Sequence, residues 1–316
     1  MQTVNTTFGQ IPGDRLGRVN VHDHIIIDGA SNPRIPEDFN HTDIHLIAPE
    51  LNAWKMAGGG AIIDSSPIGA GRNVLLLDQA SRAAGVPLIV SSGFHKSSYY
   101  PADHWLFSAS VTKLSKILID ECEKGVLLDD QHPDTSGRGQ TKAGILKFGV
   151  DSQGITPWTT RIITAMAQVL TETEINVMIH TEPGVPFEML MKHLADHQIL
   201  SSKVMLCHMG KSLDNSLFEM LAQAGYYLEF DEMVRPAPSM ELLARAILTL
   251  FDKGYGDHIL FAGDLARRSY WQCYGGHPGL AYLMAGMKSD LTELGFTLKM
   301  LDQIWIENPR RYLLQE

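Results

Sequence analysis

The feature of this sequence that most constrains its fold is a regular alternation between short apolar runs and longer stretches with helical spacing. Strands that alternate with helices predict a parallel sheet, and eight of them favour a closed (β/α)8 TIM barrel over a doubly wound sheet. The apolar, β-rich runs lie at residues 18–27, 61–64, 87–91, 143–149, 176–180, 203–208, 226–230 and 258–263. Helical spacing covers residues 44–56, 73–84, 157–170, 187–194, 213–222 and 240–248.

Local signals mark where several of these helices begin and end. Asp43 is a candidate N-cap for the first helix, and Thr156 followed by Pro157 is typical of a helix start. Gly85 and Gly225 stand where helices should end before the next strand. Such barrels need about 250 residues plus insertions. We therefore expect residues 1–316 to form a single domain.

Two further segments extend the predicted barrel. An insertion covers about residues 99–140, with a helix at 111–124 and a polar loop at 129–140. The segment 298–314 predicts a C-terminal helix with a final turn at Asn308-Pro309.

Composition excludes several classes of function. The formal net charge of −10 argues against nucleic acid as a partner, because binding a phosphate backbone requires a basic face. It does not exclude a small anionic substrate, because the charge inside a cleft can oppose the global sign. No apolar run approaches the ~20 residues of a membrane span, and residues 1–13 lack the pattern of a signal peptide. Three scattered cysteines form no disulfide framework, which favours a cytoplasmic location.

Metal-binding residue types recur where the predicted strands end. In a (β/α)8 barrel, the C-terminal ends of the strands face the active site. The first strand carries His22 and His24, which share one face because side chains at i and i+2 of a strand point the same way. The other strand ends contribute Lys147 from the fourth strand, His180 from the fifth, His208 from the sixth and Asp264 after the eighth.

Each of these residues alone has a simpler explanation. A lone histidine is more often structural than a ligand, a lysine at a strand end usually faces solvent, and Asp264 could cap the next helix. Their joint occurrence at one end of one barrel favours a metal site. Imidazoles and a carboxylate suit Zn²⁺, Mn²⁺, Co²⁺ or Fe²⁺. The amine of Lys147 could add CO2 to become N6-carboxylysine, an anion able to bridge two metal ions.

These motifs resemble the phosphotriesterase family of the amidohydrolase superfamily over nearly the whole chain. The resemblance lies in VHDHI at 21–25, AGILK at 143–147, IHTEPG at 179–184, CHMG at 207–210, FAGD at 261–264 and ENPRRYL at 307–313. The family commonly has THEH where this chain has VHDH, a change that keeps both histidines. The resemblance implies that His22, His24 and Asp264 bind one metal ion and that His180 and His208 bind the other. Carboxylated Lys147 and a hydroxide would bridge the pair.

Two-metal chemistry suggests how such a site would act. The bridging hydroxide would attack a carbonyl or phosphoryl centre, and Asp264 would carry a proton to the leaving group. GFHKSSYY and GDLARRSYW resemble the branch of the family that acts on phosphorylated sugar lactones. That likeness indicates Lys211, Arg268 and Tyr270 as phosphate ligands, with Tyr99 or Tyr100 against the sugar ring. Further loop residues with substrate-binding chemistry are His95, Lys96, Arg235 and Arg267.

Alternatives remain open at this point. A phosphotriesterase, a cyclic amidase or a deacetylase could use the same metal site, since fold fixes the substrate poorly. An alternative from a different functional class is a barrel without catalytic activity that serves only for binding. The resemblance also suggests a homodimer, which nothing in the sequence tests.

Overall fold

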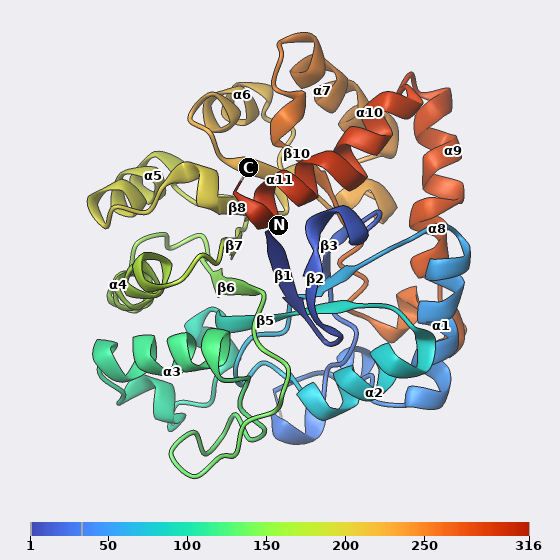
Figure 1. The fold of residues 1–316 in the computed structure, drawn as a ribbon. Helices are drawn as coiled ribbons and strands as arrows, with labels where there is room; N and C mark the ends of the chain where they lie inside the picture. The colour runs from blue at the N-terminus through green and yellow to red at the C-terminus, as the bar shows by residue number, and fades with distance from the viewer. Residues whose placement is uncertain (1, 33, 316) are drawn as a thin grey trace.

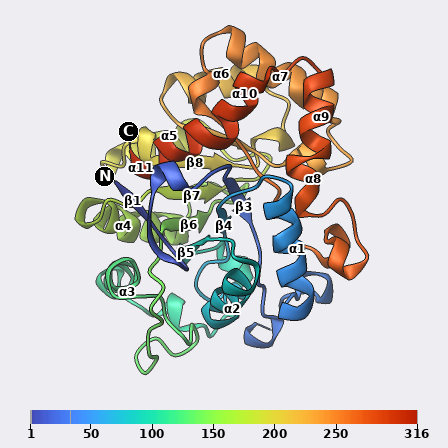
Figure 2. The ribbon, with the colours of Figure 1, turned by 45° about the vertical axis from the view of Figure 1, so that its right-hand side comes forward.

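Eight parallel strands form the centre of the molecule and are ordered consecutively from β3 to β10. The computed structural model describes residues 2–32 and 34–315. Figure 1 looks along the strands, which lie inside a ring of helices, and Figure 2 shows the same ring turned by 45°. The barrel strands are β3 (Asn20–Asp23), β4 (Ile62–Asp64), β5 (Leu88–Phe94), β6 (Ile145–Gly149), β7 (Val177–His180), β8 (Val204–Cys207), β9 (Tyr227–Phe230) and β10 (Ile259–Phe261). The predicted (β/α)8 barrel is confirmed.

The barrel nearly closes between β10 and β3 through hydrogen bonds just beyond β10. The amide of Asp264 donates to the carbonyl of His22 at 2.9 Å. The amide of Gly263 donates to the side chain of Asn20 at 3.1 Å, and that of Leu265 donates to Asp23 at 3.1 Å. The first and last predicted metal-binding segments are therefore neighbours in space.

The helices agree closely with the sequence-based expectation, and their caps explain where several begin. Asp43 accepts a hydrogen bond from the amide of His45, and Thr156 accepts one from the amide of Thr159. Gly85 ends its helix in the left-handed conformation, with φ of 66°. The helices are α1 (Ile44–Met56), α2 (Val74–Ala84), α3 (Val111–Glu123), α4 (Pro157–Glu172), α5 (Phe187–Asp196), α6 (Asn215–Gln223), α7 (Met240–Asp252), α8 (Leu280–Met284), α9 (Gly286–Glu293), α10 (Leu298–Asp302) and α11 (Asn308–Leu314). No helix among the described residues has the length and apolarity that crossing a membrane requires.

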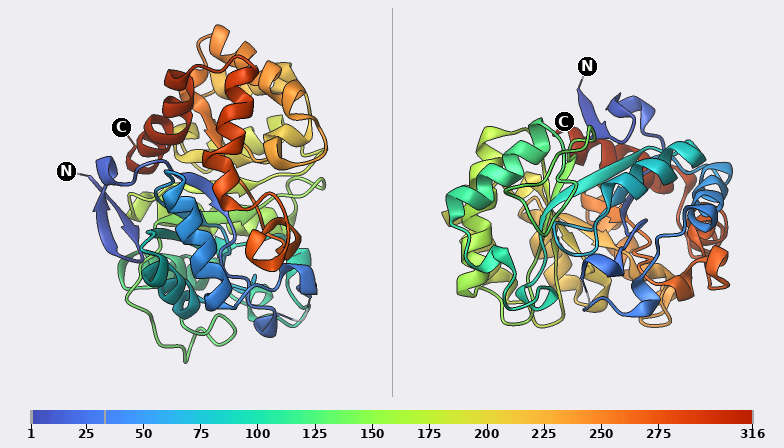
Figure 3. Two further views of the ribbon diagram at one scale, coloured as in Figure 1. Left: turned by 90° about the vertical axis from the view of Figure 1, so that its right-hand side faces the viewer. Right: turned by 90° about the horizontal axis from the view of Figure 1, so that it is seen from below.

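The two ends of the chain meet at the N-terminal end of the barrel, as Figure 3 shows from two further directions. A hairpin that the sequence did not reveal, β1 (Thr3–Thr6) with β2 (Gly9–Pro12), covers this end. The amide of Thr7 donates to the carbonyl of Leu88 at the start of β5. Tyr312 of α11 is fully buried against the same layer, and its hydroxyl donates to the carbonyl of Val177. This end is thus filled by side chains, and the opposite end is open for a site.

The predicted final turn at Asn308-Pro309 is wrong. The chain stays helical from Leu298 to Leu314, with a π-helical turn between α10 and α11, and Pro309 lies in the first turn of α11. Pro309 has no amide to pair with the carbonyl of Trp305 one turn earlier, and that carbonyl instead accepts a hydrogen bond from the amide of Val19 at 2.8 Å. The buried side chain of Asn308 donates to the carbonyls of Gly256 and Ile259, so this polar residue anchors a helix rather than a turn.

Candidate active site

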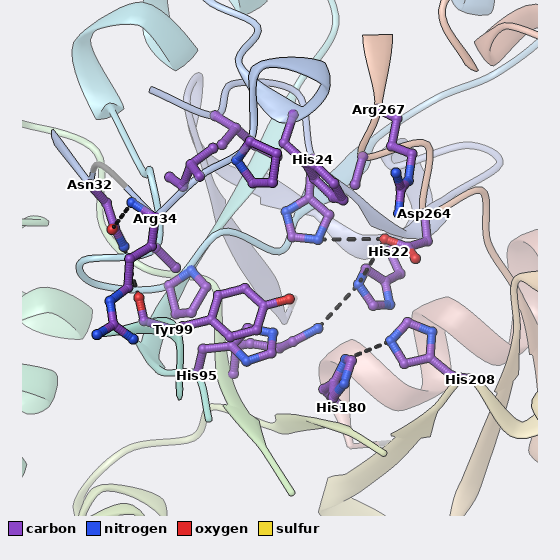
Figure 4. Close-up of a pocket in the computed structure, with 18 of the residues that line it drawn as sticks. His22, His24, Asn32, Arg34, His95, Tyr99, His180, His208, Asp264 and Arg267 are labelled. Atoms are coloured by element: carbon purple, nitrogen blue, oxygen red, sulfur yellow. Dashed lines mark hydrogen bonds and ion pairs between the residues drawn. The ribbon is translucent and has the colours of Figure 1, made fainter. Parts of the chain in front are cut away.

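Six polar side chains converge at the open end of the barrel. His22 lies in β3 and His24 just beyond it, Lys147 lies in β6, and His180 is the last residue of β7. His208 directly follows β8, and Asp264 follows β10. Figure 4 shows the four histidines and Asp264 facing a common space. The structure thus brings together the six residues that the sequence predicted as metal ligands: His22, His24, Lys147, His180, His208 and Asp264.

Short distances link these groups in two sets. Nε2 of His22 lies 3.1 Å from Nζ of Lys147, and Nε2 of His208 lies 2.8 Å from Nδ1 of His180. Oδ1 of Asp264 lies 3.7 Å from Nε2 of His22 and 3.5 Å from Nε2 of His24. Lys147 is almost completely buried and forms no ion pair with any acid among the described residues.

Two of these residues adopt a backbone conformation that L-residues avoid. His208 has φ of 64° and Asp264 has φ of 41°, both in the left-handed region. Such strain persists only where the surroundings enforce it, and it concentrates at functional sites. In both cases the sharp turn immediately after a strand directs the side chain into the space above the barrel rather than along it.

Buried carboxylates behind the histidines hold the imidazoles in place. Nδ1 of His208 lies 2.8 Å from Oδ2 of Asp231, and Nδ1 of His22 lies 3.4 Å from Oε2 of Glu229. Nδ1 of His24 lies 2.9 Å from Oγ of Ser66. The sequence reasoning missed these supporting residues. Glu229 and Asp231 occupy alternate positions at the end of β9, a strand-end signal that resembles the one that identified His22 and His24.

Burial favours the neutral form of three of these imidazoles. Burial lowers the pKa of His22, His24 and His180 well below the usual histidine value, and nearby cationic groups lower it further. Burial would raise the pKa of Asp231, but the neighbouring His208 holds it well below its usual range, and Asp231 is therefore ionised. A neutral imidazole is the form that binds a metal ion.

The arrangement of His180 and His208 fits a metal ion. Nδ1 of His208 donates to the ionised Asp231, so Nε2 carries a lone pair. This lone pair accepts a hydrogen bond from Nδ1 of His180, 2.8 Å away, which leaves the lone pair of His180 on Nε2. Nε2 of His180 is buried and has no hydrogen-bond partner among the described residues, as expected for a nitrogen that binds a metal ion. The donor set of imidazoles and a carboxylate suits a divalent transition metal, and His22, His24 and Asp264 form a second such group.

The converging residues form the floor of a cavity of about 480 Å³. Arg235 lies on one side, with Nη2 3.1 Å from Oδ2 of Asp264 and its guanidinium 4.5 Å from the ring of Tyr270. His95 stacks on Tyr99, with ring centroids 3.7 Å apart. The predicted substrate-binding residues that line the cavity are His95, Tyr99, Lys211, Arg235, Arg267 and Tyr270.

Three of the predicted substrate-binding residues do not line this cavity. Arg268 turns away and pairs with Glu37, and its guanidinium lies 5.2 Å from the ring of Tyr274. Tyr100 is buried, where its hydroxyl accepts a hydrogen bond from the amide of His95 and donates to the carbonyl of Ile68. Lys96 pairs with Glu182 beside His180. Of the two neighbouring arginines, Arg267 is the one that lines the cavity.

The loop between β3 and α1 supplies cavity residues that the sequence did not reveal. It contributes Ile27, Asn32, Arg34, Ile35, Pro36 and Phe39 to the lining. Their sequence pattern does not indicate a site, because the loop mixes polar and apolar residues without the regular spacing of a strand or a helix. Their role follows only from the folding of this loop over the strand ends.

Comparison with known proteins places the chain among hydrolases that share this barrel. Residues 2–313 match the model of the Phosphotriesterase family. The chain is 28% identical over 320 residues to a phospho-furanose lactonase of Mycoplasmopsis synoviae, with 98% of this chain and 90% of that protein covered. It is 26% identical to an N-acetyltaurine hydrolase of Danio rerio, with 98% and 97% covered. A solved amidohydrolase structure from Mycoplasma synoviae superposes with a TM-score of 0.91 at 28% identity, covering 99% and 92% of the two chains.

Proposed function

Because the chain belongs to the phosphotriesterase family, we propose that it is a binuclear metal-dependent hydrolase that attacks the carbonyl of a phosphorylated sugar lactone. Nε2 of His180, a buried nitrogen without a hydrogen-bond partner among the described residues, and the group of His22, His24 and Asp264 support the metal part of this proposal. The cationic groups on one side of the cavity support an anionic substrate. A phosphotriester would be at most a side substrate of such a site.

The six converging residues would hold two divalent ions. His22, His24 and Asp264 would bind one ion, and His180 and His208 the other. Lys147, as N6-carboxylysine, would supply an anion between them. Carboxylation would thus turn the buried amine beside the imidazoles into a negatively charged ligand. Zn²⁺ is the ion that we expect, and the donors also suit Mn²⁺, Co²⁺ and Fe²⁺.

The ions would ionise a water molecule near neutral pH and polarise the substrate carbonyl. The residues of the chain then have separate tasks. Asp264, at the junction of β10 and β3, would take up a proton at Oδ1 and return it to the leaving oxygen. Arg235 holds the other oxygen of that carboxylate at 3.1 Å, which fixes its orientation. The ring of Tyr99, held against His95, would lie against the substrate.

The phosphate group would bind on the side of the cavity formed after β8 and β10. Lys211 forms no ion pair among the residues that the structure describes, and the guanidinium of Arg267 is 3.7 Å from Asp38, a loose contact. Together with Tyr270 they would donate charge-assisted hydrogen bonds to phosphate oxygens. The protein as a whole is negatively charged, so a cluster of cationic side chains in its cavity indicates an anionic substrate.

A proton-release assay with metal-loaded protein tests the proposed reaction. The panel would contain phosphorylated five-carbon sugar lactones, their unphosphorylated counterparts, acyl-homoserine lactones, a phosphotriester and cyclic amides. We expect the phosphorylated lactones to have the highest kcat/KM. Turnover of amides alone would keep the metal site and overturn the substrate, and a protein that binds no metal would overturn the reaction.

A second candidate is the hydrolysis of an amide that carries an anionic group. The relative in Danio rerio is named an N-acetyltaurine hydrolase and aligns over 98% of this chain. A carbonyl attacked at the same metal site and an anion held by Lys211 and Arg267 would serve both reactions. N-acyl amino sulfonates therefore belong in the substrate panel.

We also predict a homodimer and a cytoplasmic enzyme. Light scattering of the purified protein would test the assembly, with a monomer mass of 35.0 kDa as the contradicting result.

A further inference from the structure

The cavity has two chemically different sides, and they come from neighbouring arcs of the barrel. The loops after β8, β9 and β10 contribute the cationic and hydroxyl groups described above. The loops after β3 and β4, on the other arc, contribute mostly apolar groups. In Figure 4, Asn32 and Arg34 lie across the cavity from Arg267. The apolar wall, as we call it below, consists of Ile27, Ile35, Pro36, Phe39, Pro67 and Ala70.

The apolar wall offers a substrate few free hydrogen-bonding groups. Asn32 is its buried polar residue, and both hydrogens of its side-chain amide are used: Nδ2 donates to the carbonyls of Gly69 and Tyr99. Its Oδ1 accepts from the amide of Arg34. The side chain of Arg34 is exposed at the mouth and donates to the carbonyl of Ser98. A sugar hydroxyl placed against this wall would lose its hydrogen bonds to water without replacement.

The wall is also held in a fixed shape. Ile27 and His41 exchange backbone hydrogen bonds of 3.2 and 3.0 Å across the β3–α1 loop. The amide of Asp28 donates to the carbonyl of Gly71 at 2.7 Å, which joins this loop to the one after β4. The buried side chain of His41 reaches the carbonyl of Ala266 at 2.8 Å, which joins it to the loop after β10. A wall fixed on three sides is a preformed subsite rather than a loop that collapses to fill space.

We propose that the substrate carries, besides its anionic group, a short apolar group that packs on the apolar wall. The substrate class is then an anionic lactone, ester or amide with an alkyl or acyl substituent. This deepens the proposed function and rests on it, because the carbonyl must lie above the converging histidines. Among the anionic substrates proposed above, it favours those with an alkyl or acyl group at this position over those with hydroxyl groups there.

Straight-chain alkylphosphonates of increasing length test this proposal, because each has an anionic head and an apolar tail. Isothermal titration calorimetry with the metal-loaded protein would measure their affinities without any turnover, so a failure here is distinguishable from a failure of the proposed reaction. We expect affinity to rise about fourfold for each of the first few methylene groups, the factor that corresponds to their burial in an apolar site. An affinity that does not depend on chain length would overturn the proposal.

Two variants of the wall test where the tail binds. Ile35→Ala should reduce the gain per methylene, because it removes part of the surface that covers the tail. Ala70→Leu should fill the subsite and weaken the longer phosphonates at least about tenfold relative to methylphosphonate. Leu242→Ala, on the exposed surface of α7, is the matched control and should leave the series unchanged. A series that both wall variants leave unchanged would place the tail elsewhere and overturn the proposal.

Discussion

Replacing Asp231 by asparagine measures how much the buried carboxylate behind His208 contributes to metal binding. The two side chains are almost completely buried, and Nδ1 of His208 lies 2.8 Å from Oδ2 of Asp231. This contact fixes the ring so that Nε2 presents its lone pair to the cavity. Asparagine has the same shape, so the change removes the charge and leaves no void.

The size of the effect follows from the kind of hydrogen bond that is lost. An ionised acceptor makes a bond about twice as strong as a neutral one, and outer carboxylates of this kind contribute roughly 10- to 100-fold to metal affinity. The asparagine side chain could still accept from Nδ1 of His208 through its amide oxygen, whereas alanine offers no acceptor. We therefore expect Asp231→Asn to weaken Zn²⁺ binding about tenfold, and Asp231→Ala about 100-fold.

The assay is a Zn²⁺ titration of the metal-free protein against a competing chelator, with circular dichroism to check that each variant folds. Asp302→Asn is the control, because it also removes a carboxylate but one at the surface, paired with Arg18. If both Asp231 variants bound Zn²⁺ as tightly as the original protein, His208 would not be a ligand held by Asp231, and our assignment would be wrong.

Three other predictions address the bridging lysine, the phosphate contacts and the stability of the fold. Lys147→Ala should lose metal and activity, with partial rescue by added short carboxylates; retention of two metal ions by elemental analysis would contradict the carboxylysine. Arg267→Gln should raise KM for a phosphorylated lactone about 10- to 100-fold, whereas Arg268→Gln should change it less than about twofold, and steady-state kinetics showing the reverse order would restore the original assignment. Arg72 is buried between Glu121 and Asp130. Arg72→Ala should lower the free energy of unfolding by about 3–5 kcal/mol, because two buried carboxylates lose their counterion. Arg245→Ala removes an exposed ion pair and should lower the free energy of unfolding by less than ~1 kcal/mol. Equal urea denaturation midpoints for the Arg72 and Arg245 variants would refute that reasoning.

The barrel was predictable because its strands are buried and its helices have a clear period. Helix α1 spans the predicted residues 44–56, with Asp43 as its cap. The β1–β2 hairpin was not predictable, because its strands have four residues each and mix exposed with buried positions. Such short, half-exposed strands resemble a polar loop, and their pairing depends on the barrel end beneath them.

The converging metal-type residues were predictable for a related reason. Because the C-terminal ends of all barrel strands face the site, residues at these ends are predicted to be neighbours in space. This rule placed His180 and His208 together, although they are 28 residues apart in the sequence. The same rule could have identified Asp231 at the end of β9. The prediction addressed only direct metal ligands, and Asp231 acts one step behind them, against His208.

Arg267 and Arg268 mark the limit of this kind of reasoning. Both follow Asp264 closely, and motif resemblance alone could not decide which of them faces the cavity. The decision is made by the distant β3–α1 loop: Glu37, 231 residues before Arg268, binds that arginine and draws it out of the cavity. Phe39 of the same loop packs under the guanidinium of Arg267. The β3–α1 loop therefore determines both the apolar wall and which arginine remains for the substrate's anion. Two enzymes with the same six converging residues could thus differ in substrate through this loop alone, and its sequence is the place to look for specificity in relatives of this protein.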